Sequence, residues 1–89
     1  LVETHARYLA SHGQQRVVIE GNTDARGGAE YNLALGQRRA DAVRRMMTLL
    51  GVSDSQIETI SFGKEKLRAK GNTEADHAEN RRADIVYQR

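Results

Sequence analysis

A short β-branched run, a polar loop and a long stretch of helical periodicity follow one another between residues 16 and 50. Residues 16–20 include three consecutive β-branched side chains, and such a run predicts a buried strand. The loop covers residues 22–28, and the periodic stretch predicts a helix that begins at residue 29 or 30 and ends at residue 50. Gly51 stands where helices often end in a left-handed residue. A strand and a helix of this length predict a domain in which helices pack on a sheet.

The predicted helix carries one apolar stripe. Projected at ~100° per residue, that stripe consists of Gly36, Ala40, Val43, Met47 and Leu50. Arg39 projects within roughly 40° of the centre of the stripe at Val43, whereas Arg38 projects to the opposite side. Arg39 is therefore predicted to face the body of the domain.

An inward-facing arginine needs a partner, because its guanidinium stays charged and its burial is unfavourable without a carboxylate nearby. Asp24, in the loop before the helix, is the nearest candidate. Two interpretations stay open on the residues alone. Asp24 and Arg39 form a structural salt bridge, or both bind one small ligand.

A ligand for such a site would be a zwitterion. Gly27 and Gly28 directly precede the predicted helix, and backbone N–H groups at a helix start attract anions. An amino-acid-like ligand could place its ammonium on Asp24, and its carboxylate on Arg39 and these amides.

The other segments alternate between helix and strand. Thr73 and Asp76 have the spacing of a capping box at the start of a short helix. The expected elements are a helix at 1–12, a strand at 57–62, a loop at 63–73, a helix from 73 to 81 or 82, and a strand at 83–87. The order α-β-α-β-α-β predicts one two-layer α/β domain over residues 1–89, with helices on a mixed sheet. A further opening strand is expected before residue 1.

Composition argues against several functional classes. The chain has no Cys, which excludes disulfides, thiolate metal sites and Cys nucleophiles. No Ser, His and acidic constellation suggests catalysis, so we predict neither an enzyme nor a metal or cofactor site. Fourteen basic residues face 12 acidic ones, and aromatic residues are only 4% of the chain. Since binding of single-stranded nucleic acid relies on stacking aromatics, a nucleic-acid partner is not expected.

Three motifs together resemble the OmpA-like peptidoglycan-binding domain, and within that family the peptidoglycan-associated lipoproteins. They are Gly21-Asn22-Thr23-Asp24-Ala25-Arg26-Gly27, then Tyr31-Asn32 with Leu35-Gly36-Gln37-Arg38-Arg39-Ala40, and finally Asn80-Arg81-Arg82-Ala83. The resemblance covers nearly the whole chain in the right order and favours the ligand interpretation.

The resemblance implies a noncatalytic domain that binds the peptide stem of peptidoglycan through meso-diaminopimelate. By analogy with the family, Asp24 and Arg39 would hold the free amino-acid end of that residue, and Asn32 and Arg81 would flank it. It also implies a lipid anchor upstream of this chain, at the periplasmic face of the outer membrane of a Gram-negative bacterium. TolB and other Tol proteins are the implied protein partners, and a Tol interaction module that binds the wall only incidentally is the alternative function.

Overall fold

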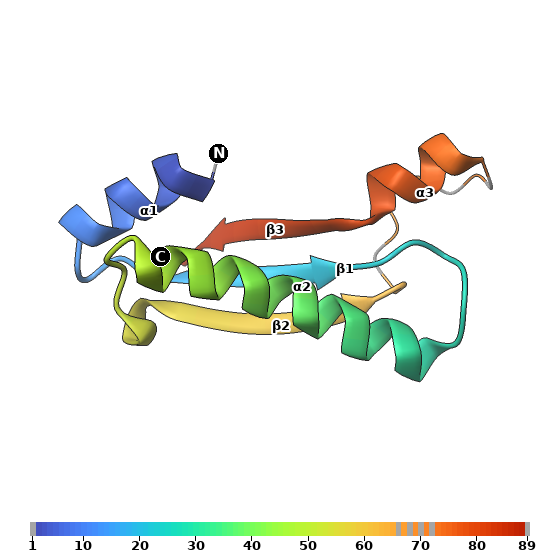
Figure 1. The fold of residues 1–89 in the computed structure, drawn as a ribbon, viewed down its shortest axis with the longest axis horizontal. Coiled ribbons are helices and arrows are strands. Elements are labelled where there is room, and N and C mark those ends of the chain that lie inside the picture. The colour runs from blue at the N-terminus through green and yellow to red at the C-terminus, as the bar shows by residue number, and fades with distance from the viewer. Residues whose placement is uncertain (1, 66, 68, 70, 72, 89) are drawn as a thin grey trace.

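The computed structural model of the chain is a three-stranded sheet with helices packed on it (Figure 1). It describes residues 2–88 except 66, 68, 70 and 72, and only the backbone of residue 79. Parts of the loop predicted at 63–73 therefore lie outside the described residues. The elements are α1 (Val2–Ser11), β1 (Val17–Asn22), α2 (Ala29–Leu49), the 3-10 turn η1 (Asp54–Gln56), β2 (Ile57–Gly63), α3 (Glu74–Asn80) and β3 (Arg82–Tyr87). The predicted order of helices and strands is confirmed.

The sheet is mixed, with β1 in the centre. β1 pairs with β2 in parallel and with β3 in antiparallel, so Val17 lies between Ile57 and Tyr87. α2 connects the two parallel strands and contacts both of them, while α1 packs beside α2. The predicted two-layer α/β architecture is confirmed.

One hydrophobic core lies between the helices and the sheet. It consists of Ala6, Leu9, Val17, Ile19, Ala40, Met47, Val52 and Ile57. The stripe predicted on α2 is confirmed for Gly36, Ala40 and Met47, which are buried. The prediction for Leu50 is wrong, because α2 ends at Leu49 and the side chain of Leu50 is 45% exposed. Gly51 has φ 99°, which confirms the left-handed residue after the helix.

A single buried side chain joins the end of α1 to the start of β2. Gln56 donates from Nε2 to the carbonyl oxygens of Leu9, His12 and Gln15 at 2.9, 3.1 and 3.0 Å. Its Oε1 accepts from the backbone N–H of Ser53 at 3.1 Å. The carbonyls of Leu9 and His12 also accept backbone N–H groups, so the Gln56 side chain adds a second donor to them and ties the turn after α1 to the start of β2.

Gln56→Ala is expected to destabilise the fold by about 1 to 3 kcal/mol, because the buried side chain and its hydrogen bonds to Leu9, His12, Gln15 and Ser53 are lost together. Urea unfolding monitored by circular dichroism measures the change. Gln14→Ala is the control, since Gln14 is exposed. Equal stability of the two variants would contradict this role of Gln56.

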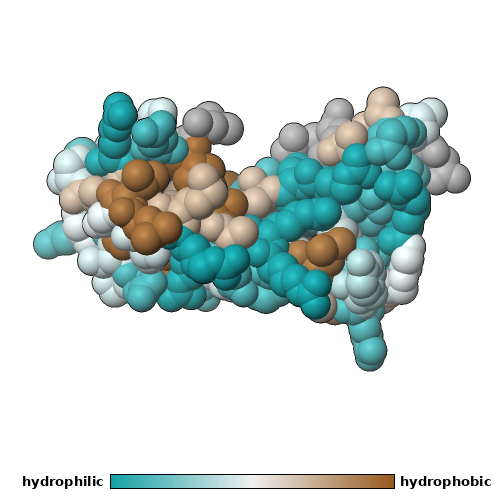
Figure 2. Space-filling model, in the orientation of Figure 1, coloured by the Kyte–Doolittle hydropathy of each residue, from teal (hydrophilic) through white to brown (hydrophobic). Residues whose placement is uncertain are grey.

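The two ends of the molecule differ in surface character. Apolar residues gather at the end where α1 lies and α2 terminates, and the other end is mainly hydrophilic (Figure 2). Exposed apolar side chains near the end of α2 include Met46, Leu49 and Leu50. Among the described helices, none is long and apolar enough to cross a membrane.

Candidate functional site

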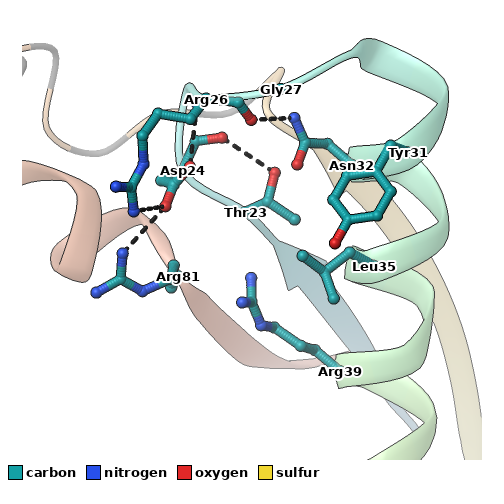
Figure 3. Close-up of a pocket in the computed structure, with 9 residues that line it drawn as sticks. All are labelled: Thr23, Asp24, Arg26, Gly27, Tyr31, Asn32, Leu35, Arg39 and Arg81. Carbon is teal, nitrogen blue, oxygen red and sulfur yellow. Dashed lines mark hydrogen bonds and ion pairs between the residues drawn. The ribbon is translucent and has the colours of Figure 1, made fainter.

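A cavity of about 260 Å³ opens at the hydrophilic end, next to the carboxyl end of β1. Its walls come from the β1–α2 loop, the first turns of α2 and the junction of α3 and β3 (Figure 3). The lining residues are Thr23, Asp24, Arg26, Gly27, Tyr31, Asn32, Leu35, Arg39 and Arg81. The carboxyl ends of parallel strands are a common position for ligand sites.

All four residues singled out from the sequence line this cavity. Asp24 lies in the loop after β1, and Asn32 and Arg39 lie on α2. Arg81 reaches the same cavity from the C-cap of α3, 57 positions after Asp24 in the chain. The fold therefore brings the predicted residues together.

Hydrogen bonds hold the loop in place around the cavity. The backbone N–H of Thr23 donates to the carbonyl of Gly63 at 2.8 Å, which extends the pairing of β1 with β2. The buried Asn32 side chain donates from Nδ2 to the carbonyl of Arg26 at 2.7 Å. Gly27 has φ 88°, a conformation that glycine adopts without strain. The side-chain oxygen of Asn32 faces the cavity (Figure 3).

Asp24 pairs with two arginines other than the one predicted. Its Oδ2 accepts from Arg26 Nη2 at 2.8 Å and from Arg81 Nη1 at 3.0 Å, and its Oδ1 accepts from the backbone N–H of Arg26 at 3.0 Å. Although both residues are described, Asp24 and Arg39 form no ion pair. The interpretation that Asp24 and Arg39 form a structural salt bridge is therefore wrong. Arg26, two residues along the same loop, reaches Asp24 more directly than a helix residue can.

Glu74 joins the same network at the start of α3. It accepts from Arg81 Nη2 at 2.7 Å and lies 3.5 Å from Arg26 Nη1. The hydrogen bond from the Arg26 side chain, with a further one from Arg81, holds the pKa of Asp24 well below its usual range. The hydrogen bond from Arg81 likewise lowers the pKa of Glu74. Both carboxylates therefore stay ionised at neutral pH.

This network predicts a specific loss of stability in acid. A carboxylate whose pKa is lower in the folded state stabilises the fold fully above its unfolded pKa, and that contribution disappears as the pH falls through the lower folded value. For Asp24 the loss is expected to begin below about pH 4. The free energy of unfolding, measured in urea from pH 7 to pH 3, should fall more for the wild type than for Asp24→Asn. Asp54→Asn, which removes a carboxylate whose side chain is 74% exposed, is the control, and parallel curves for wild type and Asp24→Asn would contradict the prediction.

Arg39 faces the cavity, as its position on the helix predicted. The side chain is half-buried, and Nη1 donates to the carbonyl of Asn22 at 2.7 Å. Among the described residues, no carboxylate pairs with this guanidinium. A guanidinium has five N–H donors, so Arg39 keeps donors that can bind a ligand carboxylate.

Several lining residues were not predicted as part of the site. Tyr31 and Leu35 form an apolar side of the cavity, and the Tyr31 side chain is 64% exposed. Arg26 was named only as part of a motif and not as a site residue. It lies two residues after Asp24, which is the spacing of an Asx turn, and this signal could have placed it beside Asp24.

Within the described ranges, no three His, Cys, Asp or Glu side chains are grouped so that they could hold a metal ion.

Comparison with known proteins identifies the family. The OmpA family matches residues 1–81. The chain belongs to the OmpA family. A crystal structure of the peptidoglycan-associated lipoprotein from Burkholderia pseudomallei superposes with a TM-score of 0.95 at 61% identity, over 98% of this chain and 74% of that one. This result confirms the resemblance predicted from the motifs and the OmpA-like fold.

Two further relatives are peptidoglycan-associated lipoproteins. The one from Legionella pneumophila is 48% identical over 98% of this chain and 49% of its own length. The one from Pseudomonas putida is 51% identical over 94% of this chain and 50% of its own length. The chain thus spans about half the length of these relatives.

Proposed function

We propose that this domain binds peptidoglycan noncovalently and without catalysis, through the meso-diaminopimelate of the peptide stem, and so links the outer membrane to the cell wall. The observation that carries the proposal is Arg39, a half-buried guanidinium in the cavity wall with no carboxylate partner among the described residues. A ligand carboxylate would compensate that charge. The names of the relatives, peptidoglycan-associated lipoproteins, support the same function.

The free end of diaminopimelate suits the site in charge and size. Its carboxylate would bind Arg39 and its ammonium would approach Asp24, with Asn32 and Arg81 beside them. The cavity of about 260 Å³ is smaller than typical pockets for drug-sized ligands. It can therefore take the end of one side chain, while the rest of the stem stays outside.

Sedimentation with purified sacculi tests the proposed function. The chain is expected to sediment with sacculi whose stems carry diaminopimelate, and an excess of free diaminopimelate stem peptide should release it. Sacculi whose stems carry Lys lack the carboxylate and should retain much less of the chain. Equal retention on both kinds of sacculi would contradict recognition through diaminopimelate, and no retention on either would contradict wall binding.

The protein partners and location are proposed on the resemblance. TolB and other Tol proteins would bind a surface that overlaps the cavity, and a lipid anchor upstream of this chain would hold the protein at the periplasmic face of the outer membrane. Pull-down of the chain by immobilised TolB, repeated with a saturating stem peptide, tests the overlap. Competition between the peptide and TolB supports one shared surface, whereas undiminished TolB binding would contradict it.

A further inference from the structure

Apolar side chains protrude at the end of α2 that lies away from the cavity. Three large ones, 45% to 86% exposed, come from the last turn of the helix and its C-cap: Met46, Leu49 and Leu50. Positions three and four apart are neighbours on a helix, so these side chains lie side by side. Apolar surface gathers at this end of the molecule (Figure 2). Single exposed apolar side chains are common in soluble proteins, whereas several together indicate an interaction surface.

Two arginines lie on the same side of α2 as Leu49. Residues 38, 42, 45 and 49 follow one another at intervals of four, three and four, which places them on one side of the helix. All four are exposed: Arg38, Ala42, Arg45 and Leu49. Together with the neighbouring Met46 they are called the outer face of α2. Among the described residues, neither arginine of this face forms an ion pair.

The acidic residues nearby do not balance the two arginines of the outer face. Asp41, four residues before Arg45, accepts a hydrogen bond from Gln37 at 3.0 Å and, in the described part of the chain, forms no ion pair. Asp54 lies 3.4 Å from Arg44, which projects to another side of the helix. The outer face therefore has a net positive charge even when Asp41 is counted with it.

A lipid surface suits both kinds of side chain on the outer face. Guanidinium groups bind phosphate oxygens, and apolar side chains beside them can enter the boundary between headgroups and acyl chains. The three apolar side chains line neither of two cavities, of about 260 and 220 Å³. They protrude instead, and a deformable lipid layer accepts protruding side chains without a matching pocket.

A second copy of the chain fits this face less well. If the outer faces of two copies packed together, the contact would contain Arg38 and Arg45 twice. Like charges brought together in an interface are unfavourable. An anionic lipid surface instead brings the opposite charge.

We propose that the outer face of α2, together with Leu50, is a peripheral membrane contact that binds anionic phospholipid surfaces. The cavity uses the first turns of α2, and this contact is centred on the last turns. At 1.5 Å per residue, Asn32 in the cavity wall and Leu49 are roughly 25 Å apart along the helix. The lipid contact is therefore separate from the proposed wall site and does not rest on it.

Sedimentation with vesicles tests this contact. The chain is expected to sediment with phosphatidylcholine vesicles that contain phosphatidylglycerol, and to stay in the supernatant with phosphatidylcholine alone. The bound fraction should fall as salt is added, because salt screens the attraction between exposed charges. Equal binding to both kinds of vesicle would overturn the inference. Binding to neither would overturn it too, and would leave the face to a protein partner.

Adjacent arginines provide a charge-matched comparison. Arg45→Gln should weaken binding to the phosphatidylglycerol vesicles about fivefold, since the variant loses one arginine at an anionic surface. Arg44→Gln changes the net charge equally, but Arg44 pairs with Asp54 and lies outside the outer face. This control should bind nearly as well as the wild type. Equal losses in the two variants would mean that binding follows net charge alone, and would overturn the inference.

The apolar part of the contact has its own pair of variants. Leu49→Ser should weaken vesicle binding at least about threefold, because the Leu49 side chain no longer enters the lipid layer. Leu33→Ser is the control, since Leu33 is 39% exposed on the first turns of α2. Equal binding of these two variants would contradict insertion of the outer face.

Two further measurements separate this contact from the alternatives. Analytical ultracentrifugation without lipid should show a monomer, and a dimer that Leu49→Ser abolishes would assign the face to a second copy and overturn the inference. A saturating stem peptide should leave vesicle binding unchanged. Loss of vesicle binding with that peptide would overturn a separate lipid contact, whereas failure of wall binding alone would overturn only the proposed function.

Discussion

Arg39→Ala is expected to weaken binding of a diaminopimelate stem peptide by about 2 to 5 kcal/mol, since a carboxylate in the cavity would lose its charged partner. Arg38→Ala is the matched control, because Arg38 is the neighbouring arginine on the exposed side of α2. Calorimetry with one peptide on both variants measures the difference.

The structural role of Arg39 is small enough for this comparison to be made on folded protein. Its one hydrogen bond among the described residues goes to the carbonyl of Asn22, and a typical hydrogen bond contributes only about 0.5 to 1.5 kcal/mol to stability. Circular dichroism should therefore show a folded Arg39→Ala variant. Equal peptide affinity of Arg39→Ala and Arg38→Ala would contradict a ligand site at Arg39.

Gly21→Ala is expected to cause the largest loss of stability, about 3 kcal/mol or more. A Cβ at position 21 would overlap the backbone carbonyl of Gly36, so β1 and α2 would have to separate. A backbone carbonyl cannot move aside by changing rotamer, and the strain therefore spreads to the packing of α2 on the sheet. The midpoint and free energy of urea unfolding measure the effect.

Gly13→Ala is the control for this substitution. A Cβ at position 13 meets no atom within 4 Å, and Gly13 does not have a positive φ. The Gly13→Ala variant should therefore be about as stable as the wild type. Wild-type stability of Gly21→Ala as well would contradict the close packing of the two glycines.

Local patterns were enough to predict the elements and their order. The β-branched run predicted β1, and the periodic stretch predicted α2 to within one residue at its end. The Thr73 and Asp76 pair predicted the start of α3, where both hydrogen bonds of the capping box are present. Each of these signals is carried by residues within a few positions of one another, so it is present in the sequence before the tertiary contacts are known.

The inward direction of Arg39 also followed from the sequence, because helix geometry fixes which residues share a face. The partners of Asp24 did not. A carboxylate can pair with any arginine that the fold brings near, and Arg81 lies 57 positions away in the chain. Only the tertiary structure decided that Arg26 and Arg81 pair with Asp24 and that, among the described residues, no carboxylate pairs with Arg39, since contacts between distant segments depend on how the helices pack on the sheet.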